Sequence, residues 1–351
     1  MRILIIRNDR IGDLISSSLI IPKIKHVFGN KISKIDLICS NYGHIYASKL
    51  KTEFSNIYVN ERSLSPAQDL KLIKTIRGNN YDLCISLSPN NKSFLLNVFS
   101  KAKLKASIRI LKKNLISRPA PFLSQYIDVF MNIENNKNYG DLTWSDFYSK
   151  LCRDIHKCIT KKEFNENAIF PSRYLKPKIK YTLNKSNISN HVIFHIDEKW
   201  QLSKIKTSIL TDMILKISKD KKVLITSNYI KTKLNDELNK KLGFENEDKG
   251  IIQSNLSKKL YLLNKIKKDN STTYLNKLIQ CISLSKCVIQ IHGVIGHYAG
   301  AFGRNIINLK IKNENLQKLY RIQTKGLYLD SYVNNSQTFR SSIINFLKKI
   351  N

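Results

Sequence analysis

The chain has 351 residues, of which 42% are hydrophobic, enough to bury two cores and to predict two domains. No apolar run approaches the roughly 18 residues needed to cross a bilayer, which predicts a soluble or peripheral protein. The 60 Lys and Arg against 26 Asp and Glu give a net charge of +34, which would suit nucleic acid, an anionic membrane or phosphorylated substrates.

In the first half, short apolar runs typical of buried strands alternate with helical or loop segments. The expected strands are RILIIR (2–7), KIDLICS (34–40), NIYV (56–59), YDLCISLS (81–88) and ASIRIL (106–111). This alternation predicts βα units around a parallel sheet, in a first domain over residues 1–170.

Around residues 171–188 the pattern dissolves into Pro, Lys, Asn and Ser, which predicts an interdomain linker. The alternation then resumes, and a second doubly wound domain is expected over 189–332, followed by a C-terminal helix over 333–351. The predicted fold is α/β, with two doubly wound parallel sheets facing a cleft. Expected strands of the second domain are HVIFHI (191–196), KVLITS (222–227), KCVIQI (286–291) and RNIINL (304–309).

The first expected loop, RNDRIGD, ends the apolar run of the first strand abruptly. Open α/β sheets bind ligands at the carboxyl ends of their strands. Gly12 would let the backbone pass close to a ligand, and Asp13 would begin the next helix. Helix capping is the alternative for Asp13, because Asp readily accepts hydrogen bonds from free N–H groups. The loop is not G-x-G-x-x-G, so a dinucleotide site is not indicated.

A second candidate site follows the strand KCVIQI, where the chain reads HGVIGHYAGAFG. Gly293 and Gly296 would let backbone N–H groups approach a diphosphate at a helix N-terminus. His297 could donate a hydrogen bond to the same group. Plain turn glycines and a structural histidine are the alternative interpretation.

The third stretch, HIDEKWQLSK, follows the first strand of the second domain. Lys199 could supply a point charge to phosphate, and Trp200 could pack beneath a ligand or fill the core. Because Asp197 and Glu198 adjoin the lysine, a solvated, salt-bridged turn is the alternative.

No cysteine pair, H-E-x-x-H motif or carboxylate cluster indicates a metal site, and no cofactor is expected. Six cysteines are scattered along the chain, several of them inside apolar runs such as DLICS. Buried, reduced thiols in a cytoplasmic protein are therefore expected.

Taken together, these stretches resemble the heptosyltransferase family, also called glycosyltransferase family 9. RILIIRNDRIGDLI is similar to the family's opening, HIDEKW falls at its lysine-containing phosphate loop, and HGVIGHYAGAFG falls at its D-x-G-x-x-H-L-A-A-A-x-G signature. The resemblance covers most of residues 1–330 in order and spacing. It implies a GT-B fold in which the second domain holds a nucleotide-sugar donor and the acceptor enters from the first.

The resemblance also implies roles for single residues. Asp13 matches the family's catalytic base, with Arg10 and Gly12 beside it in the same loop. Lys199 matches the phosphate-loop lysine, or Lys204 if the loop is shifted. The implied donor-binding residues are Lys199, His292, Gly293, Val294 and His297, although His292 stands where the signature has aspartate and Val294 where it has glycine.

The implied activity is metal-independent, inverting transfer of heptose or a related sugar from a nucleotide-sugar co-substrate to a lipid-linked or lipopolysaccharide-type saccharide. Such an enzyme would work in cell-envelope assembly, at the inner face of the cytoplasmic membrane. The basic, amphipathic LSKKLYLLNKIKK (256–268) is a candidate for contact with that anionic surface, and a solvated helix with its apolar side in the core is the alternative.

A catalytically inactive relative that binds a nucleotide sugar or glycan is the second functional hypothesis, because the signature aspartate is replaced. Nucleic acid is not an expected partner. Its binding would need a clustered basic face with stacking aromatics, whereas the lysines are dispersed along the chain.

Overall fold

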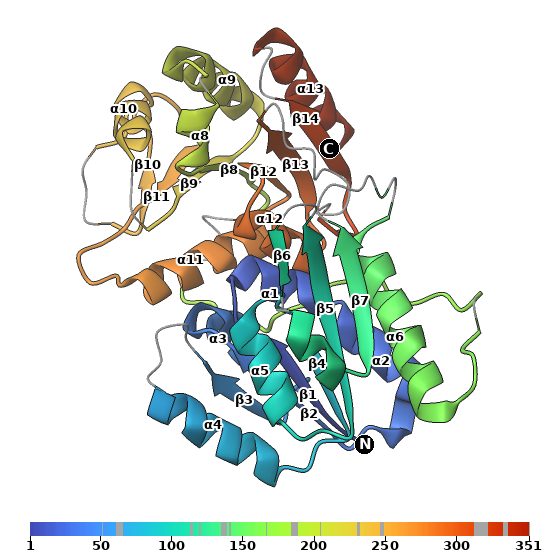
Figure 1. The fold of residues 1–351 in the computed structure, drawn as a ribbon. Coiled ribbons are helices and arrows are strands. Elements are labelled where there is room, and N and C mark those ends of the chain that lie inside the picture. The colour runs from blue at the N-terminus through green and yellow to red at the C-terminus, as the bar shows by residue number, and fades with distance from the viewer. Residues whose placement is uncertain are drawn as a thin grey trace. The chain divides into compact units, whose positions relative to one another are not determined.

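The computed structural model consists of two compact units, Met1–Lys178 and the described residues from Ile179 onward. Each unit is built on a seven-stranded sheet (Figure 1). The structure describes the chain except residues 51, 61–65, 113–114, 119–120, 135–138, 140–141, 166, 184–188, 204, 230–231, 246–248, 312–321, 333–335 and 351.

The sheet of the first unit has the strand order β3-β2-β1-β4-β5-β6, and β7 also pairs with β5. All of these pairs are parallel except β5 with β6. The order reverses direction between β1 and β4, the point at which such sheets bind ligands. The strands are β1 Arg2–Arg7, β2 Lys34–Cys39, β3 Asn56–Val59, β4 Leu83–Ser86, β5 Leu104–Lys112, β6 Leu115–Arg118 and β7 Val129–Glu134.

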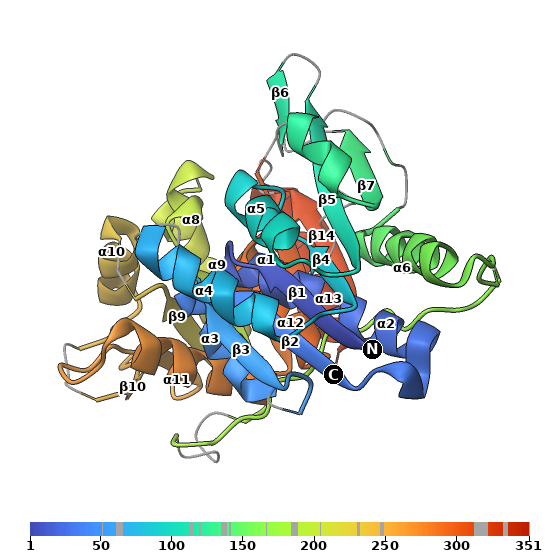
Figure 2. The same cartoon turned by 60° about the horizontal axis from the view of Figure 1, so that its bottom comes forward.

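Helices cover both faces of this sheet (Figure 2). On one face, Ile76 of α4 and Leu96 of α5 are buried with Leu4 of β1. On the other, α1 and α2 pack against the alternate residue Ile5, as the period of two in a strand requires. The helices are α1 Ile11–Ser17, α2 Ile20–Phe28, α3 Asn41–Ala47, α4 Pro66–Gly78, α5 Asn91–Phe99 and α6 Trp144–Thr160, with 3-10 turns at Gly29–Lys31, Ser48–Leu50 and Pro121–Tyr126.

The first helical segment, expected from residue 13 as one helix, is divided into α1 and α2. The hydroxyl of Ser18 donates to the carbonyl of Ile15 at 2.7 Å, a local bond that competes with helix continuation. Pro22 lies in the first turn of α2, where a proline removes no intrahelical hydrogen bond. The sequence ISSSLIIP therefore makes two short helices.

The chain passes from the first unit to the second between Lys178 and Ile179. On the first unit, the carbonyl of Pro171 accepts a hydrogen bond of 2.8 Å from the ammonium of the buried Lys23. On the second, the amide of Thr182 donates to Oε1 of Gln280 at 2.8 Å. The predicted linker therefore bonds to the first unit at Pro171 and to the second unit at Thr182.

The sheet of the second unit has the order β10-β11-β9-β8-β12-β13-β14, and only β10 with β11 is antiparallel. It repeats the doubly wound order of the first unit, so the reversal lies between β8 and β12. The strands are β8 Val192–Ile196, β9 Val223–Ser227, β10 Ile251–Gln253, β11 Leu260–Leu263, β12 Cys287–Ile291, β13 Asn305–Lys310 and β14 Tyr328–Tyr332.

One face of this sheet is covered by α9, α10 and α13, and the other by α11 and α12 (Figure 1). Leu210 of α9, Leu238 of α10 and Phe339 of α13 are fully buried in one core with the strands. The C-terminal helix thus belongs to the core of the second unit. The helices are α8 Lys199–Leu202, α9 Thr207–Asp220, α10 Lys233–Lys241, α11 Ser271–Leu284, α12 Val294–Ala301 and α13 Ser336–Lys349.

The stretch LSKKLYLLNKIKK was wrongly expected to be helical. Its central residues form β11, which pairs with β9 on one side and β10 on the other. Leu260, Leu262 and Leu263 are buried, so these apolar side chains serve the core and not a membrane surface. Their spacing fits a helix and a strand equally well, and pairing on both sides decides the outcome.

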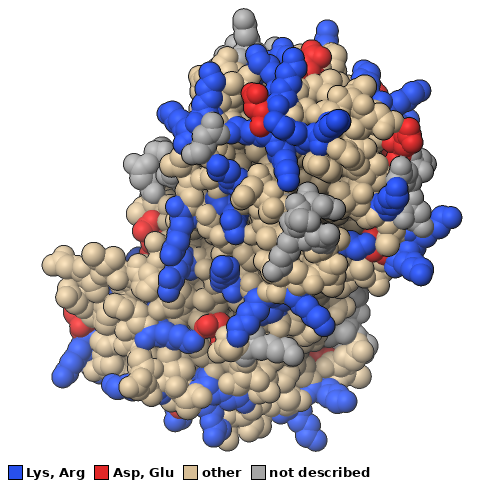
Figure 3. Space-filling view, turned by 180° about the vertical axis from the view of Figure 1, so that it is seen from behind, with Lys and Arg blue, Asp and Glu red and all other residues tan. Residues whose placement is uncertain are grey.

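The described surface agrees with the composition. Lys and Arg are spread over the face in Figure 3, with few Asp and Glu among them. Five of the six cysteines are buried, Cys158 is half-buried, and all are free thiols. Within the described ranges, no helix has the length and apolar character needed to span a membrane.

Candidate functional site

Two loops of the second unit meet after the neighbouring strands β8 and β12. Lys199 begins α8 after the first strand, and Gly293 is the N-cap residue of α12 after the second. The ammonium of Lys199 donates a hydrogen bond to the carbonyl of His292. A Cβ on Gly293 would lie only 3.2 Å from Nζ of Lys199. The lack of a side chain at this position therefore leaves room for the ammonium beside the backbone. The structure therefore brings three of the predicted residues together at a reversal point.

Helix α12 begins at this point with backbone amides directed out of its N-terminus, as the first amides of any helix are. They belong to Val294 and its successor, which directly follow Gly293, the residue whose backbone adjoins the Lys199 ammonium. Aligned amides and a nearby ammonium together form a setting suited to a phosphate group.

Gly296 has a different role from the expected one. Its amide donates a hydrogen bond of 2.8 Å to Oε1 of the buried Gln290, so this N–H is already used within the protein. A Cβ on Gly296 would lie 1.9 Å from Nε2 of Gln290 and 2.4 Å from Cδ1 of Ile322. Close packing, not approach to an anion, explains the glycine. Sequence analysis missed Gln290, which reads as part of the strand KCVIQI.

His297 lies one turn into α12, with its ring centroid 5.9 Å from that of His292. Burial lowers the pKa of His297 to about 3, and the nearby His292 and Lys199 charges act in the same direction. The imidazole is therefore neutral at physiological pH and has one N–H to donate. A diphosphate placed beside it would offset both unfavourable effects.

The turn before α8 is a rigid support for Lys199. Trp200 is 1% exposed and its indole N–H donates to the carbonyl of His195 at 2.8 Å, so it fills the core. Oδ1 of Asp197 accepts from the amide of Lys199 at 3.2 Å, and burial raises the pKa of this carboxyl to about 6. The carboxylate of Glu198 accepts from Asn228 instead. Lys204, the alternative phosphate lysine, lies outside the described residues.

In the first unit, helix α1 starts earlier than the sequence predicted. Arg10 is its N-cap residue, without a side-chain capping bond, and Gly12 and Asp13 lie inside the first turn. Asp13 is therefore not the cap. Its carboxylate is 38% exposed, with Oδ1 3.4 Å from Nη2 of Arg7.

The last residue of β1, Arg7, stands between two carboxylates. Its Nε lies 2.9 Å from Oδ1 of Asp9, and its guanidinium also donates to the carbonyl of Leu87. Burial raises the pKa of Asp9, the Arg7 charge opposes the rise, and the negative Asp13 adds to it. Of the two acids, Asp13 is the one accessible to a substrate.

A buried polar network that sequence analysis missed lies at the same edge of this sheet. Nδ2 of Asn8 donates to Oδ1 of Asn60 at 2.9 Å, and the hydroxyl of Ser93 donates to Oδ1 of Asn8 at 2.5 Å. The amide of Asn8 donates to the hydroxyl of Ser88 at 3.2 Å. Asn8, Asn60 and Ser88 each follow a strand, which is the signal that could have identified them.

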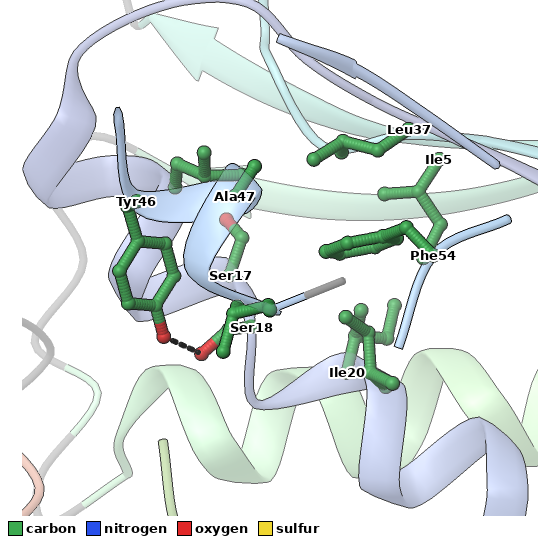
Figure 4. Close-up of a pocket in the computed structure, with 11 residues that line it drawn as sticks. Ile5, Ser17, Ser18, Ile20, Leu37, Tyr46, Ala47 and Phe54 are labelled. Atoms are coloured by element: carbon green, nitrogen blue, oxygen red, sulfur yellow. Dashed lines mark hydrogen bonds between the residues drawn. The ribbon is translucent and has the colours of Figure 1, made fainter. Parts of the chain in front are cut away.

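A small cavity beneath α1 is part of the core and not a ligand site (Figure 4). Its volume of about 10 Å³ admits about one water molecule. Apolar side chains dominate its lining, and at one end the hydroxyl of Tyr46 donates to that of Ser18 at 3.2 Å.

Comparison with known proteins gives a fold but no close relative. No protein-family model and no curated protein matches the sequence. Escherichia coli ADP-heptose lipopolysaccharide heptosyltransferase II is 13% identical over 99% of each chain, with a TM-score of 0.70. E. coli heptosyltransferase WaaC with ADP is 10% identical over 100% of each chain, at 0.67. A glycosyl transferase of family 9 from Veillonella parvula is 11% identical, covering 99% of this chain and 96% of its own, at 0.70.

At such identities the likeness concerns the fold. The predicted α/β class, with two Rossmann-like doubly wound parallel sheets, is confirmed by the strand orders and by these structures. The resemblance seen in the sequence is confirmed at the same level. The chain has the GT-B-type fold of the heptosyltransferases and of glycosyltransferase family 9.

Proposed function

We propose that the protein is a glycosyltransferase that moves heptose or a related sugar from a nucleotide-sugar donor to a lipid-linked or lipopolysaccharide-type saccharide. One observation carries the proposal: the Lys199 ammonium, the Gly293 turn and the N-terminus of α12 converge after β8 and β12. Ammonium groups and helix N-termini both favour phosphate. The fold likeness to heptosyltransferases, one of them solved with ADP, adds support.

In the proposed reaction, the bond between the sugar and the diphosphate breaks, and negative charge develops on the departing nucleoside diphosphate. Lys199, the N–H of His297 and the amides at Val294 would stabilise that charge. These groups are of the kind that can replace a divalent metal, so we propose a metal-independent reaction. His292 offers its backbone carbonyl to Lys199 and so holds the ammonium in place.

Asp13 is the proposed general base. As the acceptor hydroxyl attacks the anomeric carbon, its proton passes to the Asp13 carboxylate, and the direct displacement inverts the configuration at that carbon. Arg7, 3.4 Å from the carboxylate, would orient it, and its exposed position allows contact with an acceptor. Arg10 and Gly12 flank the base as lining residues.

Because His292 replaces the signature aspartate, a second function remains a candidate. A catalytically inactive protein that binds a nucleotide sugar or glycan would retain Lys199 and the α12 N-terminus. Such a binder has no need of the Asp13 carboxylate, so that residue separates the two functions.

We propose that the protein acts in cell-envelope assembly, in the cytoplasm or peripherally at the inner face of the cytoplasmic membrane. The net charge of +34 supports attraction to anionic lipid and to a phosphorylated acceptor. Nucleic acid is not a proposed partner, since the basic side chains visible in Figure 3 are dispersed.

The test is a transfer assay with nucleotide sugars and delipidated, truncated lipopolysaccharide core oligosaccharides as acceptors. Released nucleoside diphosphate and the mass gain of the acceptor by one sugar are measured, with and without EDTA. Asp13→Asn should lower kcat about 100-fold or more while donor affinity is kept. Asp154→Asn, which removes a surface carboxylate of α6, should match the wild type. Donor binding without release of diphosphate, unaltered in Asp13→Asn, would favour the inactive binder.

A further inference from the structure

A hollow of about 500 Å³ lies in the second unit at the amino ends of β8, β9 and β12. Lys199 and Gly293 follow the carboxyl ends of β8 and β12, so the hollow lies at the opposite edge of the same sheet. Strands of five residues separate the two edges by roughly 17 Å. We call this feature the basic hollow, and its polar lining consists of Ser189, Asn190, Asp220, Lys221, Lys222 and Lys286.

The backbone holds the basic hollow in a fixed shape. The amide of Val192 donates to the carbonyl of Lys222 at 2.8 Å, and the amide of Lys286 donates to the carbonyl of His191 at 2.8 Å. The three lysines therefore start from adjoining points on the sheet. Only their side chains need to be ordered when a ligand binds, which lowers the entropic cost.

Positive charge is concentrated in the basic hollow. Its lining carries three ammonium groups and one carboxylate. Burial lowers the pKa of Lys221, the charge of the nearby Lys286 lowers it further, and the charge of Asp220 opposes this fall. At the same edge, Nζ of Lys259 donates to the carbonyl of Asp220 at 3.2 Å. An anion between Lys221 and Lys286 would relieve their repulsion.

We propose that the basic hollow binds a phosphate group, as a second anion site separate from the proposed donor site. A phosphomonoester carries nearly two negative charges at neutral pH, which the lysines in excess of Asp220 would balance. The hydroxyl of Ser189 and the side-chain carboxamide of Asn190 would supply neutral hydrogen-bond partners for its oxygens. Soluble ligands and lipid headgroups both carry such a phosphate group.

The experiment measures inorganic phosphate binding to the full chain by calorimetry, in a chloride buffer of fixed ionic strength. The variant Lys221→Gln/Lys286→Gln should bind phosphate at least about tenfold more weakly. The matched double variant Lys233→Gln/Lys240→Gln, which removes two exposed lysines of α10, should bind as the wild type does. Both double variants are also compared in the Lys199→Gln background, in which phosphate binding at the proposed donor site is weakened.

A second arm identifies the source of the phosphate. Flotation with phosphatidylcholine vesicles, with and without phosphatidic acid, shows whether a lipid phosphate is bound. Vesicle binding that needs phosphatidic acid and is lost in the Lys221→Gln/Lys286→Gln variant assigns the basic hollow to a lipid. Phosphate binding without vesicle binding assigns it to a soluble ligand.

Two results would overturn the proposal. One is no phosphate binding by the wild type, and the other is equal weakening of phosphate binding in the two double variants. Far-UV circular dichroism confirms that each variant folds. The single variant Lys222→Gln, at an exposed lysine of the hollow, provides a second test with an expected weakening of about threefold.

Discussion

The ammonium of Lys199 donates a hydrogen bond to the carbonyl oxygen of His292, and this contact joins the loops that follow β8 and β12. It holds a positive charge beside Gly293, at the start of α12. The proposed donor site is built on this contact.

The first prediction concerns that charge. Lys199→Gln should weaken binding of the preferred nucleotide sugar about 10- to 100-fold, because a charge-assisted contact to the diphosphate is lost. Calorimetry measures the dissociation constant, with Lys216→Gln on the exposed side of α9 as the charge-matched control. Equal affinities for Lys199→Gln and the control would show that the lysine does not contact the donor.

The second prediction concerns Gly296. Gly296→Ala should destabilise the second unit by about 1–3 kcal/mol, because the added methyl group meets the side chains of Gln290 and Ile322. Urea unfolding followed by circular dichroism measures the change. Gly250→Ala is the control, since a Cβ there comes no closer than 3.8 Å to Lys277 Nζ. If Gly296→Ala is as stable as the wild type, the packing at α12 is looser than described.

The third prediction concerns the protonation of His297. In the free protein its imidazole should stay neutral down to about pH 4, because burial and nearby positive charge hold its pKa near 3. Saturating ADP should raise this pKa, since the diphosphate charge favours the imidazolium form. Histidine side-chain NMR titration, assigned with His297→Gln, measures both values. A pKa unchanged by a nucleotide that binds would place the diphosphate elsewhere.

The fourth prediction links Asp197 to the pH dependence of stability. Its folded-state pKa of about 6 lies above the ordinary 3.8, so the folded protein binds the extra proton. Stability from this group is present below pH 4 and is lost as pH rises through 6. Relative to the wild type, Asp197→Asn should therefore gain up to about 3 kcal/mol between pH 4 and pH 7. Asp212→Asn, at an exposed carboxylate, should show no such gain in parallel unfolding curves.

Much of the fold could be predicted because buried parallel strands are continuous apolar runs. RILIIR and KCVIQI stand out in the sequence for that reason and form β1 and β12. Lys199 and Gly293 could be placed at a site because each directly follows such a run. Strand ends need no tertiary information to be recognised.

Other features depend on contacts that the sequence does not display. The division between α1 and α2 arises from a hydroxyl of Ser18 that bonds to its own helix. The strand β11 forms because it pairs with β9 on one side and β10 on the other. The spacing of Leu260 and its apolar neighbours would fit a helix as well. Gln290 accepts a hydrogen bond from the amide of Gly296 across a turn, but in the sequence it looks like an ordinary strand residue.

The most direct test of the central claim is a thermal-shift screen of the purified protein against ADP, GDP, UDP, CMP and their sugar conjugates. A ligand that binds only the folded state raises the Tm. We expect one nucleotide sugar to raise the Tm selectively. This rise in Tm should be smaller in Lys199→Gln and His297→Ala and should be retained in Asp13→Ala. No shift with any nucleotide, under conditions where the protein is folded, would contradict the proposal that the second unit binds a nucleotide-sugar donor.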